Sequence, residues 1–162
     1  MTRITPLGLG EMAASRDPEE VLVCYGLGSC MGVALIDPVA GVGGMAHVVL
    51  PSSELARGPV QPGRFADTAI PALIDSILAL GGSRGRLVAK IAGGARVLDA
   101  IAPGSRLDIG TRNVEAVRQV LAAARIPLTA EDTGGNYGRT VQLVVATGQV
   151  RVSTVGRGEK VL

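Results

Sequence analysis

Aromatic side chains are nearly absent from this sequence of 162 residues, which holds two tyrosines, one phenylalanine and no tryptophan. A hydrophobic core must therefore be built from Val, Leu, Ile, Ala and Met, packed closely around 23 glycines, a composition that favours tightly apposed strands. Nucleic-acid binding relies on clustered basic residues and stacking aromatics. Here the basic residues are scattered and the net charge is only +2, so we expect no nucleic-acid partner.

Long hydrophobic runs are also missing. No window reaches the roughly 18 to 20 uninterrupted apolar residues that a membrane-spanning helix requires, and the first residues contain no long apolar segment typical of a signal peptide. We therefore expect a cytoplasmic protein without membrane insertion. A chain of 162 residues is long enough for one substantial core and short for two, so residues 1–162 are expected to form a single domain.

Reactive residues are scarce: the sequence has two cysteines, Cys24 and Cys30, and one histidine, His47. In a reducing cytosol two such cysteines are expected to be free thiols. Their spacing, C-x5-C-x16-H, matches no familiar structural zinc site and would need a carboxylate as fourth ligand. G-L-G-S at 26–29 is not followed by the helix of a dinucleotide site, and no Walker G-K-[ST] occurs. We expect neither a metal nor a cofactor.

Cys30 and His47 are together sufficient for nucleophilic catalysis on an amide or an ester. An imidazole can take the thiol proton, and the resulting thiolate can attack a carbonyl carbon. Cys30 follows a glycine-rich bend, so the backbone N–H groups of Gly28 and Ser29 are candidates to receive the negative oxygen of an intermediate. A structural role remains the alternative for all three reactive residues, because cysteines are often buried and a lone histidine is usually structural. For Cys24, on a β-prone run, a buried apolar role is the simpler interpretation.

Hydrophobic periodicity predicts strands near both ends of the chain and two helices between them. The first helix has an apolar stripe from Ile70 to Leu78, is expected to be capped by Asp67 or Thr68 so that Pro71 falls in its first turn, and ends at residues 81–82. The second follows residues 110–113. Strands are expected at residues 12–13, 21–25, 31–36, 42–50, 87–91, 128–131, 141–146 and 150–155. Without regular βαβ alternation, this order predicts a layered mixed α/β or α+β domain.

Residues 31–36 and 42–50 flank a turn and are expected to form a hairpin. If Ile36 pairs with Gly41, the paired residue numbers sum to 77, and Cys30 then lies directly opposite His47. An odd sum places the thiol and the imidazole on one face, whereas an even sum separates them. The catalytic hypothesis therefore requires a hairpin register in which the paired residue numbers have an odd sum.

Seven separate motifs in order resemble the chemoreceptor glutamine deamidase family CheD over nearly the whole chain. They are G-L-G-S-C at 26–30, D-P at 37–38, G-G-M-A-H-V-V-L-P at 43–51, P-G-R-F-A-D-T-A at 62–69, K-I-A-G-G-A at 90–95, G-T-R-N-V-E-A-V at 110–117 and A-E-D-T-G-G-N at 130–136. The resemblance implies a layered sandwich of β-sheets with helices packed outside.

In function, the resemblance implies a chemotaxis enzyme, a protein-glutamine glutaminase that converts particular chemoreceptor glutamines to glutamates and releases ammonia. Some members are also credited with hydrolysing receptor glutamyl methyl esters. The nucleophile would be Cys30 and the base His47. The family's third site position, a threonine, falls on Cys24. If that position orients the imidazole through a side-chain oxygen, a thiol is a poorer acceptor; if a backbone carbonyl does so, the change costs little.

The resemblance also implies partners: the cytoplasmic region of methyl-accepting chemoreceptors, and the phosphatase CheC as a regulator. Receptor cytoplasmic regions are helical coiled coils, so we expect a face that receives a helix, with residues 52–65 and 93–95 at its rim. The alternative function is a non-catalytic adaptor that binds receptors or CheC, with Cys24 marking decay of the site.

Overall fold

The computed structural model describes residues 1–96, 105 and 107–162, whose strands form two five-stranded sheets. Sheet A has the order β1 (Arg3–Pro6), β3 (Glu20–Leu27), β8 (Arg139–Val144), β9 (Gln149–Thr154) and β10 (Gly158–Val161). Sheet B has the order β2 (Met12–Ser15), β5 (Val42–Val48), β4 (Met31–Asp37), β6 (Val88–Gly93) and β7 (Leu128–Thr133). Both sheets are mixed, because β1 runs parallel to β3 and β6 parallel to β7.

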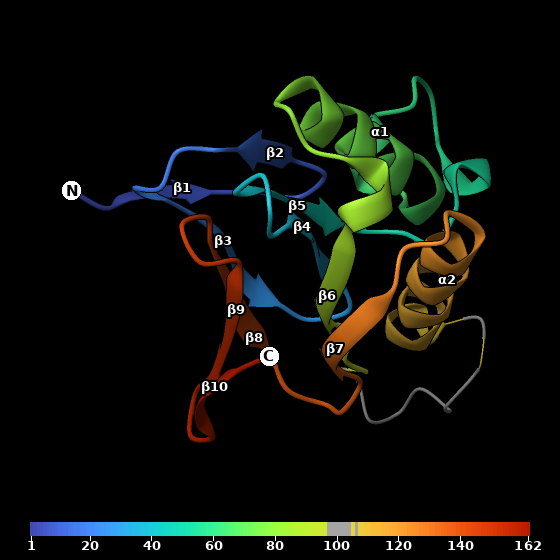
Figure 1. Cartoon of the computed structure of the whole chain (residues 1–162). Helices are drawn as coiled ribbons and strands as arrows, with labels where there is room; N and C mark the ends of the chain where they lie inside the picture. The colour runs from blue at the N-terminus through green and yellow to red at the C-terminus, as the bar shows by residue number, and fades with distance from the viewer. Residues whose placement is uncertain (97–104, 106) are drawn as a thin grey trace.

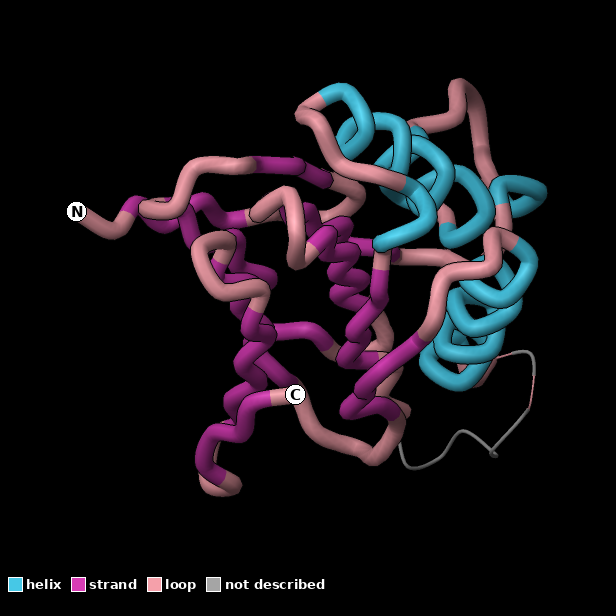
Figure 2. Tube along the Cα trace, viewed as in Figure 1, coloured by secondary structure: helices cyan, strands magenta, loops and turns pink. Residues whose placement is uncertain are grey.

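The sheets pack face to face, and helices α1 (Ala66–Ala79) and α2 (Ile109–Ala123) cover the outer side of sheet B (Figures 1 and 2). Short 3-10 turns lie at Ser53–Leu55, Pro62–Arg64 and Arg84–Arg86. One apolar core lies between the helices and sheet B, and a second lies between the sheets. The predicted layered α/β sandwich with helices outside is confirmed. None of the described helices is long and apolar enough to cross a membrane.

Strands β4 and β5 are buried along their whole length, because the helices cover one of their faces and sheet A covers the other. Strand β8 instead alternates buried and half-buried residues, since neither of the described α-helices covers the outer face of sheet A (Figure 1). Close packing explains a glycine in β5. A Cβ on Gly44 would lie 2.8 Å from Cδ1 of Leu73, so α1 rests almost directly on the strand backbone.

The β4–β5 hairpin forms where the sequence predicts it, but in a different register. Ile36 pairs with Gly43 and Asp37 with Val42, so the residue numbers sum to 79 and the predicted sum of 77 is wrong. The physical reason is that Asp37 ends β4 as a paired residue instead of opening the loop. Its Oδ1 accepts the N–H groups of residues 39 and 40 at 3.0 Å each, while Gly41, with φ of 67°, donates its N–H to the Asp37 carbonyl at 3.1 Å.

Both helices begin earlier than predicted. Helix α1 starts at Ala66 with Phe65 as N-cap, so neither Asp67 nor Thr68 is the cap, and Pro71 lies in the second turn. The start is fixed by a backbone bridge between Phe65 and Leu50 and by the Ala66 N–H, which donates to the Leu50 carbonyl at 3.0 Å.

Residues 110–113 do not precede α2 but form its first turns. The cap is Asp108, whose Oδ1 accepts the N–H of Thr111 at 3.1 Å. Strand β10 was not predicted, because its exposed sequence Gly-Glu-Lys-Val lacks the alternation of a half-buried strand. Strand β1 was not predicted either; β1 and β2 form edges of sheets A and B respectively.

The fully buried carboxylate of Asp37 ties the hairpin turn to the segment that follows α1. It accepts the Ser83 N–H at 2.7 Å and the Arg86 Nε–H at 3.0 Å. The Arg86 guanidinium and the backbone N–H donors hold the pKa of the Asp37 carboxyl well below its usual range. The charge of Asp37 therefore stabilises the turn that sets the hairpin register.

We expect Asp37→Asn to lower the free energy of unfolding at pH 7 by about 3 kcal/mol, because an amide keeps one acceptor oxygen and turns N–H donors toward the remaining N–H groups. Since the pKa of Asp37 is depressed in the folded state, its contribution is present above the ordinary carboxyl pKa near 4 and is lost as the pH falls below it.

Urea unfolding of both proteins between pH 7 and about pH 3 measures this difference in stability, which should shrink only below about pH 4. Asp75→Asn, on the exposed face of α1, is the matched control and should change stability by less than about 0.5 kcal/mol. A difference between wild type and Asp37→Asn that does not vary with pH would contradict the proposed role of the charge.

Candidate active site

Cys30 lies half-exposed between the bend at residues 28–29 and the start of β4. A glycine turn after β6 holds this bend: Gly94 donates its N–H to the Cys30 carbonyl and Ala95 donates to the Gly28 carbonyl, both at 2.9 Å. The approach is so close that a Cβ on Gly93 would lie 2.2 Å from the Cys30 carbonyl oxygen. Gly93 also has φ of 118°, so a side chain is excluded there on both counts.

The turn binds the carbonyl groups of this bend and leaves its N–H groups free. Among the described residues, no hydrogen bond is donated by the backbone N–H of Gly28, Ser29 or Cys30. These donors lie beside a half-exposed thiol, which is the arrangement that an oxyanion requires. The predicted oxyanion residues Gly28 and Ser29 therefore have backbone N–H groups that the described residues leave unpaired.

His47 lies on β5 with only 4% of its surface exposed, and an N-terminal strap, residues 7–11, is hydrogen-bonded to it at three points. The ring Nδ1 lies 2.9 Å from the Leu7 carbonyl. The His47 carbonyl accepts the Gly10 N–H, and its N–H donates to the Glu11 carbonyl, both at 2.9 Å. Because a carbonyl oxygen can only accept, Nδ1 carries the proton. In the neutral ring, Nε2 is then an acceptor able to take a proton from a thiol.

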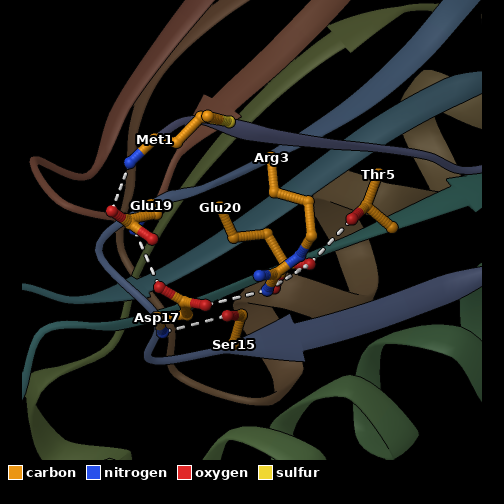
Figure 3. A network of polar contacts seen from close by, with 7 residues as sticks. All are labelled: Met1, Arg3, Thr5, Ser15, Asp17, Glu19 and Glu20. Atoms are coloured by element: carbon orange, nitrogen blue, oxygen red, sulfur yellow. Dashed lines mark hydrogen bonds and ion pairs between the residues drawn. The ribbon is translucent and has the colours of Figure 1, made fainter.

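Polar contacts hold the chain on both sides of this strap, as Figure 3 shows for the preceding and following residues. Arg3 Nη2 donates to Asp17 at 2.8 Å, Thr5 Oγ1 donates to Glu20 at 2.7 Å, and the amino terminus pairs with Glu19. The Leu7 N–H then donates to the Val23 carbonyl at 2.8 Å. The oxygen that orients His47 is thus fixed to β3.

Cys30, Gly32 and His47 share the face of sheet B that looks toward sheet A. Gly32 pairs directly with His47, so the observed odd sum places residue 30 on the same face, and Cys30 packs against the core between the sheets. Gly32 contributes no side chain beside the imidazole. Cys30 and His47 are not hydrogen-bonded to each other here, and such bonds often tighten only with substrate bound. The odd-register condition set by the sequence is met.

Cys24 lies on β3, pairs with Val141 and is fully buried. Burial, with a smaller contribution from nearby Cys30, raises the pKa of the Cys24 thiol to about 12, so this thiol stays protonated at neutral pH. Both cysteines are free. The hydrogen-bond partner of His47 Nδ1 is the Leu7 carbonyl and not the Cys24 side chain. Of the two ways left open for orienting the imidazole, the structure supplies a backbone carbonyl.

Asn113 links the cysteine bend to the end of β5 from the helix-covered side of sheet B. It is fully buried on α2, and its Nδ2 donates to the Ser29 carbonyl and to the Val49 carbonyl, both at 2.9 Å. Ser29 directly precedes Cys30, and Val49 lies two residues after His47. A single amide therefore fixes the spacing between the cysteine bend and the end of β5.

Sequence reasoning missed the contributions of Leu7 and Asn113. Leu7 acts through its backbone carbonyl, which leaves no trace in residue type. Asn113 could have been noticed in the sequence, because it is a polar residue directly before the apolar stripe of α2 and so lies near the buried face of that helix. Within the described residues, no three His, Cys, Asp or Glu side chains gather as metal ligands.

A layered α/β fold that places a half-exposed cysteine and a buried, oriented histidine on one face defines a candidate thiol hydrolase of amides or esters. Sequence comparison gives the family. The model of "CheD chemotactic sensory transduction" matches residues 49–154, and the chain belongs to the CheD family. Cys30 and His47 precede the matched residues.

Three curated relatives are similar over nearly their whole length. The "Probable chemoreceptor glutamine deamidase CheD" of Symbiobacterium thermophilum is 55% identical, over 97% of this chain and 96% of the relative. The "Chemoreceptor glutamine deamidase CheD" of Thermotoga maritima is 46% identical, over 95% and 94% respectively. A Desulfitobacterium hafniense protein named as probable CheD is 41% identical over both complete chains.

Among solved structures, Bacillus licheniformis hypothetical protein YfiH has 15% sequence identity and a TM-score of 0.49, covering 81% of this chain and 59% of that chain. Family membership therefore rests on the sequence relatives.

We expect Asn113→Asp to lower the free energy of unfolding by about 2 to 3 kcal/mol and to slow the alkylation of Cys30 or change its pH dependence. The reason is that carboxylate oxygens would then face the carbonyls of Ser29 and Val49. Urea unfolding and iodoacetamide labelling with mass spectrometry measure the two effects. Gln119→Glu makes the same chemical change on the exposed face of α2 and is the control. Equal stability and labelling in both variants would show that the Asn113 contacts do not position Cys30.

Proposed function

We propose that this protein is a chemoreceptor glutamine deamidase of a single domain, in which Cys30 is the nucleophile and His47 the base. The observation that carries the proposal is the orientation of His47: the Leu7 carbonyl holds the proton on Nδ1 and leaves Nε2 for the shared face on which Cys30 lies. Family membership supports the substrate, since the relatives are named for deamidation of chemoreceptor glutamines.

The proposed reaction begins when His47 Nε2 takes the proton of the Cys30 thiol. The thiolate sulfur bonds to the amide carbon of a receptor glutamine, and the carbonyl electrons move to its oxygen, which the N–H groups of Gly28 and Ser29 would receive. The tetrahedral intermediate collapses, the carbon–nitrogen bond breaks, and the imidazolium protonates the leaving ammonia. Water, activated by His47, then hydrolyses the thioester to glutamate and regenerates the thiol.

The protonated thiol explains the need for a base. Burial raises the pKa of Cys30, and the positive charge of Arg64 opposes this only in part. The cysteine therefore rests as a thiol near neutral pH, and ionisation has to be coupled to proton transfer. The same acyl transfer would accept a glutamyl methyl ester, with methanol leaving in place of ammonia.

The proposed partners are the cytoplasmic region of methyl-accepting chemoreceptors and, as a regulator, the phosphatase CheC, both met in the cytoplasm. Residues 52–65 and 93–95 remain the proposed rim of the contact. The turn at 93–95 binds the cysteine bend directly, and the carbonyl of residue 64 accepts the N–H groups of the two residues that follow β5, so both segments lie beside the candidate site. A receptor helix bound there would present its glutamine to Cys30.

We expect Cys30→Ala and His47→Ala each to reduce deamidation by at least about 10³-fold while the fold is kept. Incubation with receptor cytoplasmic fragments, followed by mass spectrometry of each glutamine, measures conversion. Far-ultraviolet circular dichroism and thermal unfolding check the fold. Tight receptor binding by the wild type without ammonia release would instead support a non-catalytic adaptor.

We expect Cys24→Ala to retain the deamidation rate within about threefold, less than about 0.7 kcal/mol in activation free energy, because the Leu7 carbonyl orients His47. The same fragments and mass spectrometry apply. In iodoacetamide labelling near neutral pH, the half-exposed Cys30 should react faster than Cys24, since Cys24 is buried and burial raises the pKa of its thiol to about 12. A hundredfold loss of rate in Cys24→Ala would assign its side chain to the reaction.

A further inference from the structure

A cavity of about 360 Å³ opens between the end of β5 and the 3-10 turns at Ser53–Leu55 and Pro62–Arg64. Its apolar lining includes Leu50, Leu55 and Phe65, and two guanidinium groups, those of Arg57 and Arg64, also line it. No Asp or Glu side chain belongs to the lining. The cavity is therefore a cationic pocket with apolar walls.

The pocket adjoins the candidate active site through the backbone. The Arg64 carbonyl accepts the N–H groups of Val49 and Leu50, at 2.9 and 3.0 Å, just beyond His47 on the chain. Val49 is also tied to Ser29 through Asn113. In agreement with this placement, burial raises the pKa of the Cys30 thiol and the positive charge of Arg64 partly opposes that rise. A substrate group in the pocket would thus lie next to the group that reacts.

Neither guanidinium is neutralised by the described part of the chain. Arg57 is exposed and Arg64 half-buried, and among the described residues neither forms an ion pair or a side-chain hydrogen bond. Asp67, the acidic residue that follows Arg64 most closely, is already engaged by Ser53, whose N–H and Oγ donate to it at 2.9 and 2.8 Å. Two unpaired cations beside a reactive thiol complement an anionic side chain.

We propose that this pocket binds a carboxylate side chain, glutamate or aspartate, that lies near the target glutamine in the receptor segment. The proposal rests on the proposed deamidase function and adds a determinant of which glutamine is chosen. The guanidinium groups of Arg57 and Arg64 would bind the carboxylate, while Leu55 and Phe65 would contact the methylene groups of the substrate side chain. On a helical segment the side chains on the face of the glutamine are three or four residues away, so the acidic residue is expected at one of those positions.

The test uses a receptor fragment whose modified glutamine has been identified by mass spectrometry. Each acidic residue within four positions of that glutamine is replaced singly by methionine, which is neutral and of similar length. Steady-state kinetics of ammonia release are measured for the wild type, for Arg64→Gln and for the control Arg151→Gln, whose arginine is exposed on β9 and remote from the pocket lining.

For the wild type, removal of one acidic residue should raise KM about tenfold with little change in kcat, as expected for loss of one charge-assisted contact. Arg64→Gln should raise KM for the unaltered fragment and show a smaller further rise with the altered one, because only Arg57 remains to bind the carboxylate. Arg151→Gln should behave as wild type. Added salt should raise KM most when the acidic residue and both guanidinium groups are present, because screening weakens their attraction.

Two results would overturn the proposal. The first is a KM that does not depend on any nearby acidic residue. The second is a fall in kcat of Arg64→Gln that is equal for both fragments and accompanied by slower alkylation of Cys30, because Arg64 would then support the thiolate and not bind substrate. Failure of the wild type to release ammonia from any fragment would contradict the deamidase function itself, so the two failures are distinguishable.

Discussion

The backbone ladder between β4 and β5 is the constraint on which the candidate site depends. Side chains alternate between faces along each strand, so a slip of one residue would send His47 to the helix-covered face, where Val48 now packs. The turn around Asp37 prevents this slip, because its carboxylate and carbonyl satisfy three N–H groups of the turn in a single register. A buried charge far from the chemistry therefore determines which side chains can meet.

Groups from distant parts of the chain, most of them backbone groups, hold Cys30 and His47 in place. The N-terminal strap orients the imidazole, the turn at residues 93–95 holds the cysteine bend, and Asn113 joins that bend to the end of β5. Most of these contacts use carbonyl and N–H groups, which every residue type except proline offers. This explains how a cysteine can occupy position 24, where the family resemblance places threonine, without removing the partner of His47.

Hydrophobic periodicity was sufficient to predict most strands and both helices, because burial on one face or both imposes the pattern that the sequence shows. The order of these elements predicted a mixed α/β or α+β domain, and the resemblance to CheD implied the sandwich with helices outside. Periodicity could not fix boundaries that depend on tertiary contacts. The start of α1 is set by the pairing of Phe65 with Leu50, and the hairpin register by hydrogen bonds to Asp37. For the site, scarcity singled out Cys30 and His47 as candidates, and the family resemblance implied their roles. The Leu7 carbonyl was beyond prediction, since backbone contacts carry no signature in residue type.

The dispersed origin of the site has a consequence during synthesis of the chain. The oxygen that orients His47 comes from residue 7, while the amide that fixes the cysteine bend comes from residue 113. A ribosome-bound chain that ends before α2 would contain both the thiol and the imidazole but not this amide. Such a chain lacks the hydrogen bonds that join the cysteine bend to the end of β5, so the proposed site reaches its described form only after α2 has docked.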